Sequence, residues 1–275
     1  MIKEISWQNG EWFDIDKIKI SIKDRGLRFG DGIFETILIK DKKPILFEEH
    51  IKRFEKSASI LGFKLPLKDI KLKEIINQGI EKLLINKNDY GAIRINYSRG
   101  LNKKRSIKIS EIINQSNMCN LWIEFNLIDF NFLPINVIIS EKEKRNEFSQ
   151  LSKCKTFSYS QSIQALREAN EKNYDDCLIL NTNNELCCGT TFNLIIKRDE
   201  KWITPRKESG CLPGIMINQL LKLNIIEEDY ILPSFNENDI LIAMNSLSCR
   251  QINKVDNLKF KNNFDTKFFW DLIYI

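Results

Sequence analysis

Two lysines separated by a single residue, Lys153 and Lys155, are competing candidates for chemistry in the segment 151–159. A lysine amine that becomes neutral can attack an aldehyde, and it can then act as an acid and as a base. The chain is rich in lysine, so either residue can equally be a solvated surface charge. The lysines alone therefore define a candidate site without deciding which residue reacts.

His50 is the only histidine, which excludes a histidine-based triad and a multi-histidine metal site. We expect it to have a helix-surface or capping role. The cysteines are odd in number and contain no Cys-x-x-Cys pair; they lie at positions 119, 154, 177, 187, 188, 211 and 249. This pattern predicts neither a disulfide framework nor a zinc site, so we expect no metal and mostly buried, reduced thiols.

Length and charge restrict the class of protein. A chain of 275 residues can bury a core in one large or two medium domains, and we expect two. The net charge of +5 comes from lysines interleaved with acidic residues, which is typical of a solvated surface and not of a nucleic-acid-binding patch. Because no stretch approaches the ~20 apolar residues of a membrane span, we expect a cytoplasmic protein.

Hydrophobic periodicity predicts the elements that must position these residues. Ile51, Phe54, Ala58 and Leu61 recur on one helical face. Further helices are expected at 69–86, at 157–171 and from about 213. Strands are expected at 33–39, 92–97, 120–128, 133–139, 193–197 and 201–204, with a hairpin at 177–186.

The polar segment 101–118 lacks periodicity and predicts an interdomain connection or an exposed loop. We therefore place the boundary near residue 118. The N-terminal domain, 1–118, is expected to be a smaller α+β unit. The larger C-terminal domain, 119–275, is expected to carry the reactive lysine.

Four separated parts of the sequence, read together, resemble the class IV aminotransferase family, the fold-type IV enzymes that use pyridoxal 5′-phosphate (PLP). They are 24–36, 49–58, 151–159, and the pair 185–194 and 204–216. They occur in the family's order and spacing across roughly residues 24–250. In the first part, Gly30 and Gly32 permit a tight bend entering a strand. The segment is not a dinucleotide fingerprint, because no third glycine opens a helix in a βαβ unit. The resemblance implies a two-domain α+β fold similar to D-amino acid aminotransferase.

The resemblance also implies how the cofactor is held. It assigns Lys155 as the Schiff-base lysine and places Tyr159 beside the cofactor's phenolic oxygen. It assigns Arg53 to the phosphate, which a guanidinium fork suits. The loop 204–216 resembles a phosphate loop entering a helix; Pro213 would take an early helical position and the amides of Ile215 and Met216 would face the phosphate.

Substrate contacts are implied less directly. Thr36 matches an active-site threonine of the lyase branch and is a candidate for substrate or proton handling. Ser246 and Leu247 lie in a stretch resembling a loop whose backbone donors meet phosphate or a substrate carboxylate. Arg94 and Arg99 are candidates for substrate carboxylates, although either can be a surface charge. The resemblance further implies a homodimer with a small-molecule substrate.

Cys188 stands where the family has a glutamate that pairs with the protonated pyridine nitrogen of the cofactor. A carboxylate keeps that ring cationic and electron-withdrawing, whereas a neutral thiol is a poor partner. Glu185 lies three residues earlier and would normally point to the opposite strand face. A local register change could bring it back.

Size and motif detail, including Met216, favour 4-amino-4-deoxychorismate lyase, which makes 4-aminobenzoate and pyruvate for folate synthesis. Aromatisation of the product would reduce the demand on the cofactor ring, so this reaction tolerates Cys188 best. The alternatives are a class IV aminotransferase acting on branched-chain or D-amino acids, and a PLP-binding protein with little catalysis.

Overall fold

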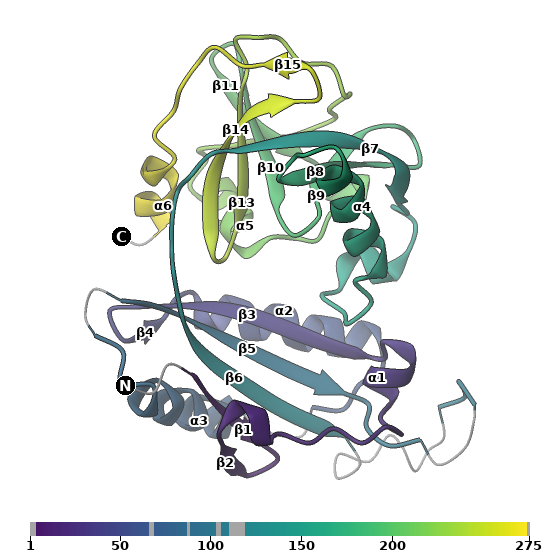
Figure 1. The fold of residues 1–275 in the computed structure, drawn as a ribbon, viewed down its shortest axis with the longest axis vertical. Helices are drawn as coiled ribbons and strands as arrows, with labels where there is room; N and C mark the ends of the chain where they lie inside the picture. Colours follow the sequence, from purple (N-terminus) through teal and green to yellow (C-terminus); the bar gives the residue numbers. More distant parts are fainter. Residues whose placement is uncertain (1–3, 66–68, 87–88, 103–105, 110–118, 274–275) are drawn as a thin grey trace. The chain divides into compact units, whose positions relative to one another are not determined.

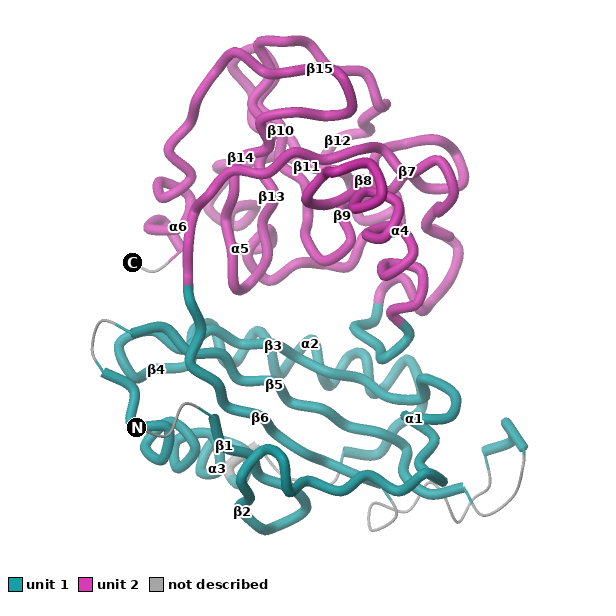
Figure 2. Tube along the Cα trace, viewed as in Figure 1, with its two compact units in different colours: residues 1–129, 154–158 teal, residues 130–153, 159–275 magenta. Residues whose placement is uncertain are grey.

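The computed structural model describes residues 4–65, 69–86, 89–102, 106–109 and 119–273. The chain forms two compact units (Figure 2). Unit 1 comprises residues 1–129 and 154–158, and unit 2 comprises residues 130–153 and 159–275. Both units combine helices with a sheet, as the sequence predicts for an α+β protein.

Unit 1 contains a six-stranded sheet in the order β2-β1-β6-β5-β3-β4 (Figure 1). Its long strands β3, β5 and β6 are antiparallel neighbours. The elements are β1 (Glu4–Gln8), β2 (Glu11–Phe13), η1 (Ile15–Lys17), α1 (Arg25–Phe29), β3 (Gly32–Lys40), β4 (Lys43–Pro44), α2 (Phe47–Ile60), α3 (Asp69–Lys82), β5 (Tyr90–Ser98) and β6 (Asn120–Ile128).

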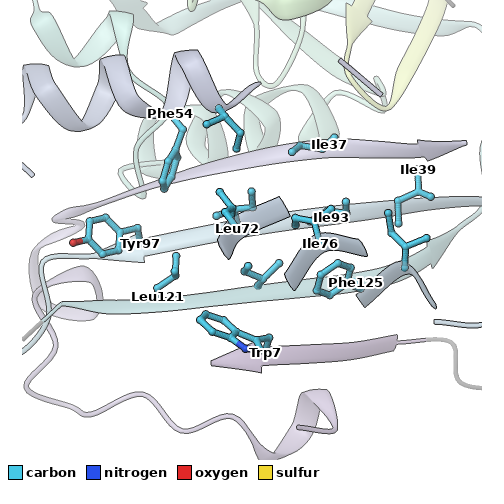
Figure 3. Packing of buried hydrophobic residues seen from close by; sticks show 14 of the residues in the cluster. Trp7, Ile37, Ile39, Phe54, Leu72, Ile76, Ile93, Tyr97, Leu121 and Phe125 are labelled. Carbon is cyan, nitrogen blue, oxygen red and sulfur yellow. The ribbon is translucent and has the colours of Figure 1, made fainter. Parts of the chain in front are cut away.

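One face of this sheet is apolar and carries α2 and α3. Successive strand side chains point to opposite faces, so Ile33, Ile37 and Ile39 of β3 lie together on this side. They pack in one core with Phe54 of α2 and Ile76 of α3 (Figure 3). The intervening residues of β3, including Phe34 and Thr36, therefore lie on the opposite face.

Unit 2 contains a nine-stranded sheet in the order β12-β11-β10-β13-β14-β7-β8-β9, with β15 paired to β14. The pairs β14–β7, β7–β8 and β11–β12 are parallel. The elements are β7 (Ile135–Arg145), η3 (Gln150–Lys153), α4 (Ser160–Glu171), β8 (Asp176–Asn181), β9 (Leu186–Gly189), β10 (Asn193–Arg198), β11 (Lys201–Pro205), η4 (Lys207–Ser209), α5 (Ile215–Lys222), β12 (Glu227–Asp229), β13 (Ile240–Asn245), β14 (Ser248–Val255), β15 (Leu258–Lys259) and α6 (Lys267–Ile273).

The boundary expected near residue 118 is wrong. β6 follows that position, but it pairs with β5 along nine residues and with β1 along five, which ties it to unit 1. Unit 2 begins at Phe130. Residues 154–158 also belong to unit 1, so Lys155 is not carried by the C-terminal unit. Most of the expected linker, 103–105 and 110–118, lies outside the described residues.

Across the described residues, no helix combines the length and apolarity that crossing a membrane requires.

Candidate active site

Lys155 lies in a short extended segment that pairs with the start of β3. Ile33 and Thr156 form an antiparallel bridge, and the Phe34 amide donates to the Lys155 carbonyl at 2.9 Å. A Cβ at Gly32 would come within 2.2 Å of the Phe157 ring, so glycine allows this close approach. The glycines of the segment 24–36 thus help to position Lys155.

The two competing lysines differ in environment. Lys153 ends η3 and is exposed. Lys155 is half-buried, and its Nζ lies 4.4 Å from the centroid of the Phe34 ring. The face of the Phe34 ring holds the end of the Lys155 side chain by a cation–π contact. Lys155 is therefore positioned on the sheet face, whereas Lys153 is a surface side chain; that Lys155 is the reactive residue stays a prediction.

Thr36 and Arg94 share a face of the sheet with Lys155. Thr36 follows Phe34 by two residues on β3 and is paired in register with Arg94 of β5. The Arg94 guanidinium carbon lies 3.8 Å from the centroid of the same Phe34 ring. The face thus presents an amine, a hydroxyl and a guanidinium around one aromatic side chain.

Arg94 is held by a chain of hydrogen bonds along β5 and β6. Its Nε donates to Asn96 Oδ1 at 2.8 Å, and Asn96 Nδ2 donates to Glu124 Oε1 at 2.9 Å. Trp122 Nε1 donates to the same Glu124 oxygen at 3.0 Å. These contacts orient the guanidinium on the sheet face, where it can bind a carboxylate.

Arg99 occupies a different environment and is only 3% exposed. It donates to the Asp31 carboxylate at 2.9 Å and to the carbonyls of Leu61 and Gly62 at 2.8 and 2.9 Å. Its guanidinium also stacks over the Phe63 ring at 4.0 Å. These contacts fix neighbouring loops and give Arg99 a structural role; that it binds a substrate carboxylate stays a prediction.

Arg53 is tied to a buried carboxylate under α2. Its Nε and Nη2 each donate to Glu35 at 2.7 Å, and Glu35 has no exposed surface. His50 Nδ1 lies 2.7 Å from Glu35 Oε2. His50 itself is only 1% exposed, so the expected helix-surface role is wrong. The three residues form one buried polar cluster in the otherwise apolar core.

The protonation states of this cluster follow from burial and charge. Burial would raise the pKa of Glu35, but the charge and hydrogen bonds of Arg53, with help from His50, lower the pKa to about 2. Burial lowers the pKa of His50, against the opposing effect of Glu35. The neutral ring therefore donates from Nδ1 to an ionised carboxylate, and Arg53 is fixed by that carboxylate.

In unit 2, the predicted phosphate loop leads into α5. Gly214 is the N-cap, so Pro213 lies before the helix. The sequence-based expectation that Pro213 takes an early helical position is therefore wrong. The first helical bond runs from the Asn218 amide to the Gly214 carbonyl at 2.9 Å. The amides of Ile215 and Met216 precede it and have no partner within the helix, which is the arrangement that binds anions.

The remaining predicted cofactor contacts lie at turns of unit 2. Tyr159 is half-buried, and its carbonyl accepts the Ile163 amide at 2.9 Å at the start of α4. Ser246 and Leu247 form the turn between β13 and β14. The Leu247 amide donates to Asn245 Oδ1 at 2.8 Å, so this donor serves the turn itself.

Cys188 lies on β9 beside a β-bulge. Leu186 pairs with Leu180 and Cys188 pairs with Ile179, which leaves Cys187 as the extra residue. Glu185 accepts from Asn181 Nδ2 at 3.1 Å and from Ser209 Oγ at 3.2 Å. The register change therefore acts on Cys187, and the Glu185 carboxylate is used by Asn181 of the same turn and by Ser209 of η4.

The thiol of Cys188 is not an ordinary neutral thiol. A hydrogen bond with Cys187 and the charge of Arg145 outweigh burial, which acts in the opposite direction, and lower its pKa to about 6. The hydrogen bond to Cys188 raises the pKa of Cys187 well above its usual value. These effects favour ionisation of Cys188, and the sequence alone does not show that Arg145 lies beside it.

The charged residues Glu35, Arg145 and Glu124 are among the members of these clusters that the sequence does not single out. Glu35 shares the apolar face of β3 with Ile33 and Ile37, and a carboxylate in such a pattern signals a buried ion pair. Arg145 and Glu124 carry no comparable signal. A single charge in a strand is usually solvated.

Comparison with known proteins agrees with this arrangement. The amino-transferase class IV family model matches residues 32–255. A branched-chain-amino-acid aminotransferase-like protein of Arabidopsis thaliana is 26% identical over 84% of this chain, and the match covers 40% of that relative's length. A candidate 4-amino-4-deoxychorismate lyase from Legionella pneumophila has a similar structure, with a TM-score of 0.80, 26% identity and 95% of each chain covered.

A PLP-bound hypothetical aminotransferase from Mycobacterium tuberculosis has a TM-score of 0.81 at 17% identity, covering 98% of this chain and 97% of its own. This likeness shows a shared fold. The two-domain fold-type IV architecture predicted from the sequence is thus confirmed. The family match spans both units and most of the chain. The chain belongs to the amino-transferase class IV family.

Proposed function

We propose that this protein is a PLP-dependent lyase that converts 4-amino-4-deoxychorismate to 4-aminobenzoate and pyruvate. The observation that carries the proposal is the shared sheet face on which Lys155, Thr36 and Arg94 surround Phe34. An amine, a hydroxyl and a carboxylate-binding cation are what proton transfer on an amino-bearing carboxylic acid requires. The similarity to the Legionella protein supports the same choice.

The residues of each unit fit PLP. In unit 1, Lys155 offers an amine for the aldehyde, and Arg53 offers a guanidinium fixed by Glu35. In unit 2, the Ile215 and Met216 amides at the start of α5 suit the cofactor's phosphate. The half-buried Tyr159 suits the cofactor's phenolic oxygen. That these residues hold one cofactor stays a prediction. PLP would supply an aldehyde that takes up the substrate amine and a ring that withdraws electrons.

The chain's own groups then have separate tasks. Lys155 Nζ takes a proton from the amine-bearing carbon and returns it during loss of the three-carbon unit. Arg94 binds a substrate carboxylate. Thr36 Oγ1, paired in register with Arg94, orients the substrate for this transfer. Formation of an aromatic product drives the elimination.

A second candidate is a class IV aminotransferase on branched-chain or D-amino acids. The lowered pKa of Cys188 favours this aminotransferase candidate. Amino transfer needs an electron-withdrawing cofactor ring, and an ionised thiol could replace the missing glutamate as the anion that keeps the ring protonated. The third reading, a PLP-binding protein with little catalysis, has no comparable support. The family resemblance also leads us to propose a homodimer, which light scattering would test.

Product analysis separates these candidates. PLP-loaded protein is given aminodeoxychorismate and, separately, pairs of amino and keto acids. The lyase proposal predicts pyruvate and 4-aminobenzoate in equal amounts from the first and slow amino transfer with the second. Rapid amino transfer without pyruvate release from aminodeoxychorismate would favour the aminotransferase.

A further inference from the structure

Three buried thiols gather in unit 2, where β9 meets the loop before α5. Cys187, Cys188 and Cys211 pack together and are 1%, 8% and 5% exposed. In a regular strand, Cys187 and Cys188 would point to opposite faces. The β-bulge at Cys187 interrupts this alternation and re-aims its side chain, so the two neighbouring thiols form a hydrogen bond.

A fixed cation faces this cluster from the end of β7. Arg145 donates to Gln161 Oε1 at 2.9 Å and to Ser162 Oγ at 2.7 Å, both on α4. It also hydrogen-bonds the Cys188 sulfur. Because α4 holds the guanidinium in place, its charge bears on Cys188 without the entropic cost of ordering a long side chain.

The other ionisable groups around the cluster act more weakly or oppose ionisation. Asp176 of β8 disfavours a negative Cys188, but its own pKa is raised by burial, and it accepts hydrogen bonds from Thr190 Oγ1 and the Cys177 amide, each at 2.7 Å. Tyr159 faces Arg145 from the start of α4.

Within the cluster, only one thiol loses its proton readily. Burial and the charge of Cys188 raise the pKa of Cys211 to about 12, and the pKa of Cys187 is also raised. Cys187 therefore remains a donor, and the negative charge is localised on Cys188. Among the described residues, no group of three or more His, Cys, Asp or Glu side chains is arranged to hold a metal ion.

We propose that Cys188 is a thiolate that places a negative charge beside the cofactor's ring nitrogen, and that Arg145 and Cys187 hold it ionised. The inference rests on the proposed function for the identity of its partner. The thiol proton leaves to solvent and the ring nitrogen takes one up, which gives a thiolate beside a pyridinium. An anion at this position keeps the ring protonated and electron-withdrawing, as a carboxylate would.

The ionisation is tested on the full chain without cofactor by following thiolate ultraviolet absorbance against pH. Subtracting the Cys188→Ser titration from that of the wild type should leave one thiolate appearing near pH 6. Cys187→Ala and Arg145→Lys should each move this step toward the ordinary thiol value. The matched control Cys211→Ala should leave it in place. A Cys188 step at about 8.5, the unperturbed thiol value, would overturn the proposal.

The partner is tested by the absorbance of PLP-loaded protein against pH. Cys188→Asp should keep the wild-type protonated-ring spectrum, and Cys188→Ser should lose it at a lower pH than the wild type does. Identical spectra for wild type and Cys188→Ser would overturn the assigned partner, even with a thiolate present. If PLP does not attach to Lys155 at all, the proposed function fails, while the thiol titration still reports the ionisation independently.

Discussion

The Arg53 guanidinium forms two hydrogen bonds of 2.7 Å with Glu35, a carboxylate that has no exposed surface. A buried pair of this kind fixes the cation in one orientation and is expensive to break. Unit 1 therefore presents Arg53 as a rigid group. The same contact makes the stability of the unit depend on the ionisation of Glu35.

Glu35→Gln should lower the free energy of unfolding by about 3 kcal/mol, because it leaves the Arg53 charge uncompensated in the interior. The pKa of Glu35 is lowered on folding from 4.5 to about 2. Its ionisation therefore stabilises the fold fully above pH 4.5, and this contribution is lost as the pH falls towards 2. Urea unfolding at several pH values should show this loss in the wild type and not in the variant. Parallel curves for the two proteins would contradict the assignment.

Arg53→Ala should weaken PLP binding by about 1–3 kcal/mol, the range for losing a charge-assisted contact. Arg53→Lys is the matched control, since it keeps a charge beside Glu35 but loses the fork. We expect an intermediate affinity for it by fluorescence titration with PLP. Unchanged PLP affinity in both variants would remove Arg53 from the site.

Thr36→Val is nearly isosteric and removes only the hydroxyl. It should lower kcat roughly tenfold, the equivalent of one neutral hydrogen bond, and should leave PLP affinity unchanged. Steady-state kinetics with aminodeoxychorismate, together with a PLP titration, measure both quantities. A loss of PLP affinity that equals the loss of turnover would place Thr36 at the cofactor.

Substitutions of Arg94 and Arg99 should have opposite effects on KM and on Tm. Arg94→Lys removes a half-buried fork from the sheet face and should raise KM about tenfold with little change in Tm. Arg99→Lys breaks the contacts to Asp31 and two carbonyls and should lower Tm by several degrees with KM unchanged. The reverse pattern would show that Arg99, and not Arg94, binds the substrate.

The sequence predicts the regular elements well where the pattern is local. The helix bearing Ile51, Phe54 and Ala58 is α2, and the hairpin at 177–186 is β8 with β9. The domain boundary could not be read locally, since β6 is joined to unit 1 by long-range hydrogen bonds with β1 and β5. A polar loop and a domain boundary have the same local composition.

The roles of single residues can likewise be predicted where they depend on local sequence, and not where they depend on contacts between distant segments. Lys155 could be selected from motif and position, but its proximity to Phe34 depends on a bridge between residues 33 and 156. The neutral state expected for Cys188 considered only the residue type, whereas the surroundings of the thiol lower its pKa. A one-residue bulge and a guanidinium 43 positions earlier, Arg145, decide its ionisation.

The most direct test of the account is the location of PLP on the chain. PLP-loaded protein is reduced with borohydride, digested and mapped by mass spectrometry, with Lys155→Ala and Lys153→Ala as a matched pair. We predict an adduct on Lys155 in the wild type and in Lys153→Ala, and none in Lys155→Ala. An adduct on Lys153, or no adduct after verified PLP loading, would contradict the account.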